Sequence, residues 1–114
     1  MDFRLKKEKD FDKVFKKGKR IYSRELTLII LESTELKVGY AVSKKHGKSV
    51  VRNRIKRILR ESFRSFLPVI RKNFFFVFIP KVLEEYSLES FKSNMEYLFK
   101  KGNLLVENVE KVSD

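Results

Sequence analysis

The sequence predicts a single domain of the α/β class, an α+β two-layer sandwich with a central mixed sheet of about three to four strands. Two observations support this fold class. Segments with a helical period alternate along the chain with short runs of β-branched and aromatic residues. A helical segment also separates two predicted strands, which is typical of a βαβ crossover between parallel neighbours. The expected order is an N-terminal helix, the sheet with a basic crossover helix, and a C-terminal helix.

The composition fits one folded domain that carries a strong positive charge. The chain has 114 residues, a formal net charge of +12 and 13% aromatic residues, whereas basic disordered tails lack such aromatics. Residues 1–114 are taken as one domain, with residues 103–114 as a C-terminal extension. The absence of cysteine excludes disulfides and Cys-based zinc sites. No apolar run reaches the roughly 18 residues that span a membrane, so we expect a cytoplasmic protein.

The N-terminal segment predicts an amphipathic helix that begins near Glu8 and ends at Gly18. Phe11 and Phe15 share one face of this helix. Two aromatic residues four positions apart commonly belong to a core. Six lysines surround them, however, so a platform for base stacking is an open alternative. These lysines are Lys6, Lys7, Lys9, Lys13, Lys16 and Lys17.

Two strands are expected next. Residues 21–32 predict one strand, bent near its start at Ser23 and Arg24. Residues 38–43 predict a second strand, antiparallel to the first. Because successive side chains of a strand point to opposite faces, one face of the second strand carries only the small residues Gly39, Ala41 and Ser43. These residues leave a shallow trough, which either lets a helix approach closely or forms a binding cleft.

The last two elements are a buried strand and a helix. Residues 74–79 are apolar at every position, which predicts a strand covered on both faces and ended by Pro80. The crossover would make this strand a parallel neighbour of residues 38–43. Ser87 is expected to cap a C-terminal helix that ends at Gly102. The core stripe of that helix is Leu88, Phe91, Met95, Leu98 and Phe99. The tail beyond it fits either a frayed extension or a packing segment.

The most informative stretch is residues 44–66, which hold nine Lys or Arg residues and one acid, Glu61. From Ser49 onward the pattern has a helical period. One arc of the helix is predicted to be buried: Val51, Ile55, Ile58, Leu59, Ser62, Phe63 and Phe66. A second arc is polar and basic: Arg52, Asn53, Lys56, Arg57, Arg60 and Arg64, with Arg54 beyond its edge.

The basic arc requires a partner of opposite charge. Like charges four residues apart on a helix repel each other by a few tenths of a kcal/mol. A solvated polar face, the simpler interpretation, usually mixes both signs of charge. Because the planar guanidinium of arginine suits phosphate and stacks on bases, the pattern favours nucleic acid as the partner.

No protein catalyst is evident in the sequence. A protein nuclease needs clustered carboxylates for metal ions or an acid–base pair. His46 is the only histidine, and Glu8, Asp10 and Asp12 are interleaved with lysines, which favours surface ion pairs. We therefore predict no catalytic residue and no metal site in the protein. A metal-dependent protein nuclease is the weakest alternative.

One run of residues resembles a known family. The sequence GYAVSKKHGKSVVRNRIKRILRESFR, residues 39–64, is similar to the signature of the protein subunit of bacterial ribonuclease P, including its Arg-Asn-Arg core. The N-terminal residues also fit the opening of that family: Arg4, Leu5, Asp10, Phe11, Val14, Phe15, Lys16 and Gly18. The resemblance covers the chain up to about Gly102.

The resemblance implies a protein that binds the catalytic RNA of ribonuclease P and the 5′ leader of precursor tRNA. Such a protein assists endonucleolytic removal of the leader, while the RNA performs catalysis with Mg²⁺ that it mainly holds itself. The resemblance implies one protein per RNA, and we expect no DNA or membrane partner. The strands on both sides of the basic helix argue against a DNA-binding regulator. A ribosomal or general RNA-binding protein without a role in cleavage is the alternative.

The resemblance also implies two groups of site residues. The catalytic RNA and substrate would contact the basic loop and helix: Lys44, Lys45, Lys48, Arg52, Asn53, Arg54, Lys56, Arg57, Arg60 and Arg64. The leader would lie in a cleft formed by Phe11, Phe15, Lys16, Gly39, Ala41 and Ser43. Relatives often place an aromatic residue in the first strand, where this chain has Leu26, Leu28, Ile29 and Ile30.

Overall fold

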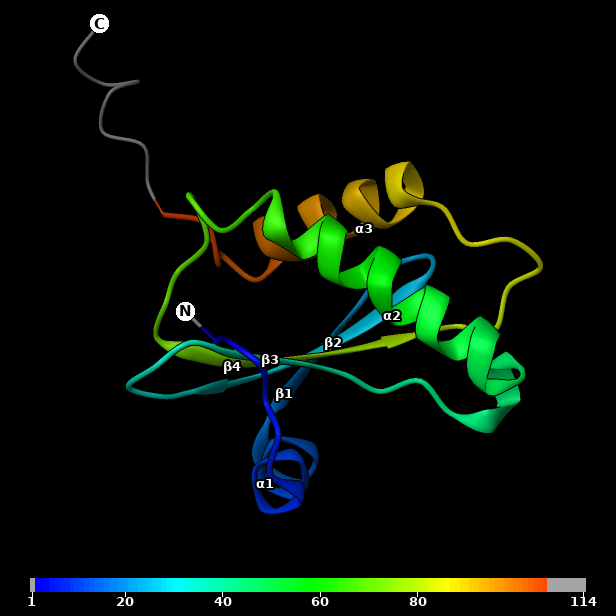
Figure 1. Ribbon diagram of the computed structural model, residues 1–114. Coiled ribbons are helices and arrows are strands. Elements are labelled where there is room, and N and C mark those ends of the chain that lie inside the picture. The colour runs from blue at the N-terminus through cyan, green and yellow to red at the C-terminus, as the bar shows by residue number, and fades with distance from the viewer. Residues whose placement is uncertain (1, 107–114) are drawn as a thin grey trace, which may run out of the picture.

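The computed structural model describes residues 2–106 and confirms the predicted α+β class. The elements in chain order are α1 (Glu8–Lys17), β1 (Lys19–Tyr22), β2 (Leu26–Glu32), β3 (Lys37–Tyr40), the 3-10 turn η1 (Lys44–His46), α2 (Ser49–Arg64), β4 (Phe74–Pro80) and α3 (Leu88–Lys101). In Figure 1 the sheet lies between α1 on one face and the pair α2 and α3 on the other. None of the helices described is long and apolar enough to span a membrane.

The sheet has four strands in the order β1-β2-β4-β3. β1 pairs antiparallel with β2, and β2 pairs antiparallel with β4. β3 and β4 are parallel neighbours joined through α2, as the crossover predicted. β3 and β2 run in opposite directions, as predicted, although β4 lies between them. The continuous apolar run of β4 suits this central position, where both faces are covered.

The predicted single strand at residues 21–32 is wrong, because the chain reverses there into the β1–β2 hairpin. Tyr22 pairs with Thr27, and the backbone N–H of Ser23 donates to the carbonyl of Leu26 at 2.8 Å. A side chain from α3 holds this turn. Asn94 Oδ1 accepts hydrogen bonds from Ser23 Oγ at 2.7 Å and from the N–H of Glu25 at 2.9 Å. The turn contains no Gly, Pro or Asn, and Ser23 is its only typical turn residue, so the sequence signal for a turn is weak.

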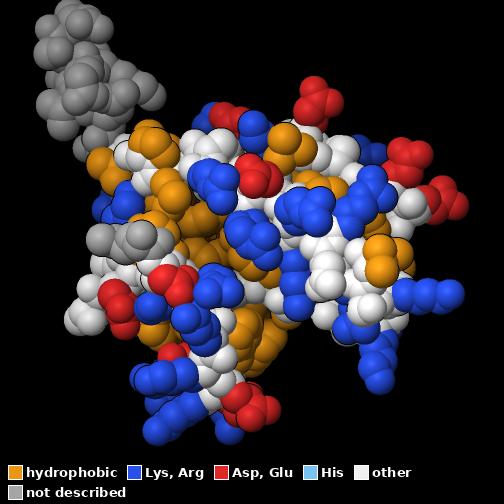
Figure 2. Space-filling view, viewed as in Figure 1, with side chains coloured by type: hydrophobic (Ala, Val, Ile, Leu, Met, Phe, Trp, Pro, Cys, Tyr) orange, Lys and Arg blue, Asp and Glu red, His pale blue; other side chains and the backbone are white. Residues whose placement is uncertain are grey.

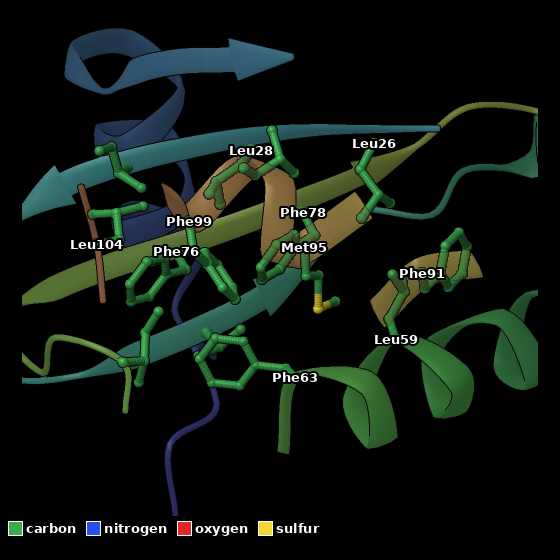
Figure 3. Close-up of a cluster of buried hydrophobic side chains, with 14 of the residues drawn as sticks. Leu26, Leu28, Leu59, Phe63, Phe76, Phe78, Phe91, Met95, Phe99 and Leu104 are labelled. Carbon is green, nitrogen blue, oxygen red and sulfur yellow. The ribbon is translucent and has the colours of Figure 1, made fainter. Parts of the chain in front are cut away.

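The main core lies between the sheet and the pair α2 and α3. Phe99 of α3 is at its centre, with its ring centroid 5.0 Å from that of Phe66 and 6.1 Å from those of Phe63, Phe76 and Phe78. Figure 3 shows these two helices and the strands contributing side chains to one cluster. Edge-to-face packing of this kind adds to the stabilisation from apolar burial.

Two positions predicted to be buried are exposed. Val51 is 40% exposed and Leu88 is 39% exposed, although the other residues of both predicted arcs are buried or half-buried. Each of the two lies in the first turn of its helix, Val51 in α2 and Leu88 in α3. A helical period places a residue on a face but does not show where along the helix the contact with the sheet begins.

A smaller core lies under α1 on the opposite face of the sheet. Its buried residues are Leu5, Val14, Ile29, Phe75 and Val77. Gly18 ends α1 as predicted, with its N–H donating to the carbonyl of Val14 at 2.8 Å. A Cβ at Gly18 would lie 2.5 Å from both Val14 O and Ile29 Cγ2, so the absence of a side chain lets β1 start directly beneath the helix.

The first residues after α3 pack against the domain. Leu104 is buried, and Leu105 forms an antiparallel bridge with Ile70. Of the two predictions for the tail, a frayed extension or a packing segment, the packing segment is the one that residues 104–105 form. Residues 107–114, which include most of the predicted extension, lie outside the described residues.

Candidate nucleic-acid interface

The basic face of α2 points away from the main core. Ile55, Leu59 and Phe63 bury one side of the helix, which turns the opposite side to solvent. Arg54, Arg57, Arg60 and Arg64 are exposed with Asn53, while Arg52 and Lys56 are half-buried. Figure 2 shows blue side chains spread over the region of α2.

Few acids offset this charge. Within residues 2–106, Arg64 is the only basic residue of α2 that forms an ion pair, with Glu61 at 3.3 Å. Exposed ion pairs of this kind contribute little to stability. The remaining cations keep their attraction for an external anion, which is the electrostatic pattern of a phosphate-binding surface.

A hydrogen bond from its single histidine, His46, attaches the loop before α2 to the end of β4. His46 Nε2 lies 2.7 Å from the carbonyl oxygen of Pro80, and His46 Nδ1 accepts from the N–H of Ser43 at 3.1 Å. Since Pro80 offers only a carbonyl oxygen at this contact, Nε2 is the donor to it. His46 therefore positions the loop that displays the exposed Lys44 and Lys45.

The loop enters α2 through Gly47, whose φ of 130° favours glycine. Arg52 reaches back to this junction, with Nε donating to the carbonyl of Gly47 at 3.1 Å. Lys48, the N-cap residue of α2, is exposed. The structure thus joins the predicted basic residues of the loop and the helix into one surface.

A second surface lies beside α1. The rings of Phe11 and Phe15 are stacked, with centroids 6.5 Å apart and planes 24° from parallel. Both rings are half-buried and pack on the smaller core. Figure 2 shows exposed hydrophobic side chains in the gap between the α1 region and the rest of the domain.

The small residues of β3 allow this helix to approach. A Cβ at Gly39 would lie 2.5 Å from Phe11 Cζ, so close packing of the helix accounts for the trough at that position. Ala41 and Ile79 continue the same face of the sheet and are half-buried. With Phe11 and Phe15, these residues form a half-buried apolar surface beside α1, at the place where the resemblance implied the leader cleft.

Two residues assigned to this cleft lie at its margins. Lys16 is on the outer surface of α1 with Lys9 and Lys13. Ser43 follows β3, and its Oγ accepts from the N–H of Lys45 at 3.3 Å as the cap of the turn. The structure therefore brings together Phe11, Phe15, Gly39 and Ala41.

The aliphatic residues of β2 do not line the open part of the cleft. Leu26, Leu28 and Ile30 belong to the main core on the other face of the sheet. Ile29 faces α1 but is fully buried beneath it. These side chains are therefore buried and present no open wall beside α1.

The acidic residues of α1 form neither a carboxylate cluster nor the predicted surface ion pairs. Glu8, Asp10 and Asp12 make no ion pair within 4.0 Å among the described residues, so the expected surface pairs are absent there. Water competes well for such exposed groups. Across residues 2–106, no three His, Asp or Glu side chains lie close enough to hold a metal ion.

A hollow that no sequence pattern predicted lies on the α2 side of β3. The hollow has a volume of about 290 Å³ and is bordered by Arg4, Tyr40 and Arg60 among other residues. The sequence contained one indication of this hollow: the alternation of side chains along β3 places Tyr40 on the face opposite to Gly39 and Ala41. The contact between the N-terminal segment and β3 depends on the tertiary structure.

Comparison with known proteins gives a consistent match. A family model described as Ribonuclease P matches residues 2–103. A Bacillus velezensis protein named Ribonuclease P protein component is 38% identical over 104 residues, which cover 89% of this chain and 90% of that protein. A protein of the same name from Caldanaerobacter subterraneus is 37% identical, over 91% of this chain and 92% of that protein.

Solved structures agree with these sequence matches. The RNase P protein of Staphylococcus aureus has a TM-score of 0.80 and 26% identity, over 91% of this chain and 98% of that one. The RNase P protein of Thermotoga maritima in complex with 1-(4-fluorophenyl)-2-thiourea has a TM-score of 0.77 and 30% identity, over 86% of this chain and 98% of that one.

Proposed function

Because this chain belongs to the ribonuclease P protein family, we propose that α2 binds the catalytic RNA and that the cleft beside α1 binds the 5′ leader of precursor tRNA. As a protein component of ribonuclease P, the chain takes part in the endonucleolytic step that forms the mature 5′ end of tRNA. The observation that carries the proposal is the basic face of α2, where only Arg64 has an acidic partner among the described residues.

Binding of the catalytic RNA is assigned to the continuous surface of the loop and α2. Its residues are Lys44, Lys45, Lys48, Arg52, Asn53, Arg54, Lys56, Arg57, Arg60 and Arg64. The pinned loop and the buried side of α2 support this role because they hold the charges in a fixed arrangement before RNA binds. A preorganised site loses less conformational entropy on binding.

Leader binding is assigned to the apolar cleft beside α1. Phe11 and Phe15 offer two half-buried rings, and Ala41 and Ile79 continue the surface along the sheet. Base stacking on aromatic rings tolerates any sequence because every base has a flat face. This property suits a leader whose sequence varies between precursors. The roles of Lys16 and Ser43 at the margins stay predictions.

Catalysis is assigned to the RNA, with Mg²⁺ held mainly by that RNA. The protein then acts by offsetting phosphate repulsion between the two RNA molecules and by keeping the leader beside the cleavage site. One protein per catalytic RNA is sufficient for this arrangement, which we place in the cytoplasm. Neither DNA nor a membrane is needed as a partner.

Cleavage of a precursor tRNA with a 5′ extension at low Mg²⁺ tests the proposed function. Three samples are compared: the protein alone, a bacterial ribonuclease P RNA alone, and the two together. We expect efficient cleavage only in the mixture. Cleavage by the protein alone would contradict the assignment of catalysis to RNA. Binding without stimulation would instead indicate a general RNA-binding protein.

A pair of double variants makes the same assay specific for α2. The variant Arg57→Ala/Arg60→Ala removes two exposed charges from the basic face. Its control, Lys100→Ala/Lys101→Ala, removes two exposed charges from the end of α3 and changes the net charge equally. Stimulation should fall in the first variant and persist in the second. Equal losses would show that only the total charge matters.

A further inference from the structure

The hollow beside α2 combines an apolar floor with a basic rim. Its lining is Asp2, Phe3, Arg4, Val38, Tyr40, Arg60, Phe63, Arg64 and Leu67. In Figure 2 it is a recess with a hydrophobic floor and blue side chains at its edge, between the N-terminal segment and α2. Its volume of about 290 Å³ lies just below the range for pockets that take one small molecule, about 300 to 1,000 Å³.

The N-terminal segment closes one side of the hollow because it is hydrogen-bonded to the edge of the sheet. The N–H of Val38 donates to the carbonyl of Phe3 at 2.7 Å, and the N–H of Leu5 donates to the carbonyl of Val38 at 2.9 Å. Phe3 packs against the main core, and Val38 is buried within it. This wall is therefore part of the folded domain.

The floor offers flat, half-buried aromatic surface. Tyr40 stacks on Phe78, with ring centroids 6.1 Å apart and planes 16° from parallel. The Tyr40 hydroxyl makes no hydrogen bond to another described residue. Because no polar side-chain atom among these residues is buried without a partner, this hydroxyl is open to solvent. Burial raises the pKa of the Tyr40 hydroxyl, and the charges of Arg60 and Arg64 oppose this shift only in part. The neutral hydroxyl can donate and accept one hydrogen bond each.

The rim favours an anion. Arg60 has no acidic partner within 4.0 Å among the described residues, whereas Arg64 is paired with Glu61. The one acid of the rim, Asp2, lies 3.3 Å from Arg4 Nε and 2.8 Å from Lys6 Nζ. Hydrogen bonds from Lys6 and Arg4 hold the pKa of Asp2 well below its usual range, so this carboxylate stays ionised and is neutralised locally. The net charge of the rim is therefore positive.

We propose that this hollow receives one unpaired nucleotide of RNA, with its base on the aromatic floor and its phosphate at Arg60 and Arg64. The inference rests on the proposed function and names a nucleotide subsite within it. Charge complementarity and continuity with the basic face of α2 favour RNA as the occupant. The hollow faces α2, whereas Gly39 and Ala41 face α1, so a base bound here is separate from the leader in its cleft. The nucleotide belongs either to the catalytic RNA or to the precursor tRNA.

Chemical probing of bases in the assembled holoenzyme tests this subsite. Leu67→Trp adds a large side chain at the wall of the hollow, and Tyr40→Phe removes only the hydroxyl. We expect one unpaired base to be protected by the wild-type protein and to become reactive with Leu67→Trp. Its position in the catalytic RNA or in the precursor identifies the source. An unchanged protection pattern in both RNAs would overturn the inference.

A thermodynamic cycle then tests contact with that base. Removing the base from the RNA should weaken binding by about 5-fold to 150-fold, the range for loss of one stacked base. Tyr40→Phe should weaken binding of intact RNA about 3-fold to 10-fold and have little effect on the abasic RNA. Equal effects on both RNAs would show that the Tyr40 hydroxyl does not contact the base.

Two controls separate this inference from the proposed function. Arg57→Ala removes an exposed cation of α2 that does not line the hollow, so it should weaken binding without exposing the protected base. Thermal unfolding of each variant establishes that the domain is folded. If the wild-type protein binds RNA and stimulates cleavage but no base depends on the hollow, only the subsite is wrong. If the wild-type protein fails to stimulate cleavage, the proposed function itself fails.

Discussion

The two faces of the sheet differ in how their helices are held and in what they offer to RNA. On one face, α2 and α3 share a core of seventeen buried residues that is rich in phenylalanine. On the other, α1 rests on a cluster of five buried residues. The well-held face carries the exposed cations of α2, and the lightly held face carries the two stacked rings of α1.

Under the proposed function, this difference separates two kinds of RNA recognition. A charged surface attracts phosphate over a distance, and its contribution falls as salt concentration rises. An apolar cleft acts only at contact and depends on stacking. A fixed array of charges suits a structured RNA, whereas a lightly held helix can adjust to single-stranded bases of different size. β3 contributes to both faces through alternate residues, with Gly39 toward α1 and Tyr40 toward α2.

The largest predicted effect is on stability and contrasts the two cores. Phe99→Ala should lower the free energy of unfolding by about 3 to 5 kcal/mol, because the ring packs against four other phenylalanines. Val14→Ala should cost about 2 kcal/mol, since it removes two buried methyl groups from the smaller core. Denaturant unfolding measures both values.

Hydrogen exchange sharpens the same contrast. In Val14→Ala the amides of α1 should lose protection first, while those of β4 and α3 keep most of theirs. In Phe99→Ala protection should fall in α2, α3 and the sheet together. Uniform loss of protection in both variants would show that the two cores unfold as one unit and that α1 is not separately mobile.

The next effect concerns leader binding by the cleft. Replacing Phe11 or Phe15 by Ala should weaken binding of leader-bearing precursor by about 1 to 3 kcal/mol per lost stack. Mature tRNA, which has no leader, should bind almost as before. Binding of both RNAs to the assembled holoenzyme measures the difference, and the loss should change little with salt. Equal losses for precursor and mature tRNA would contradict the assignment of the leader to this cleft.

The sequence predicted best those features that depend on local pattern. The helical period located α2 and its basic face, and the apolar run of residues 74–79 predicted a strand covered on both faces. Contacts between distant segments were not predictable. The β1–β2 turn is held by Asn94 of α3, some seventy positions away, and its one typical turn residue is Ser23. The hollow likewise depends on the N-terminal segment pairing with Val38.

The candidate site shows the same division. The spacing of arginines placed Arg57 and Arg60 on one face, because helical geometry alone decides that. The pairing of Gly39 with Phe11 needed the tertiary structure, since a trough of small residues is equally compatible with packing and with binding. Charge and periodicity left a stacking platform at Phe11 and Phe15 and a binding cleft at the trough as open alternatives, and the resemblance to a family joined them into one predicted leader cleft. Lys16 and Ser43 depend on that resemblance alone.

The smallest predicted effect is the salt dependence of a single charge on α2. Each phosphate contact contributes about 0.7 to 0.9 to the slope of log affinity against log salt concentration. Arg57→Ala should therefore reduce the slope for the catalytic RNA by somewhat less than one unit, measured by binding titrations across a salt series. Lys101→Ala removes an equal charge from α3, where the ammonium lies 5.6 Å from the centroid of the Tyr97 ring, and should leave the slope unchanged.

The substitution Arg57→Lys separates charge from shape at the same position. It keeps the positive charge, so the salt slope should stay close to that of the wild type. A fall in affinity at constant slope would show that the planar fork of Arg57 makes paired hydrogen bonds or stacks on a base, which an ammonium group cannot do. A slope unchanged even by Arg57→Ala would mean that this side chain touches no phosphate. The phosphate contacts of α2 would then have to be assigned to Arg60 and Lys56, the neighbours of Arg57 on the helix.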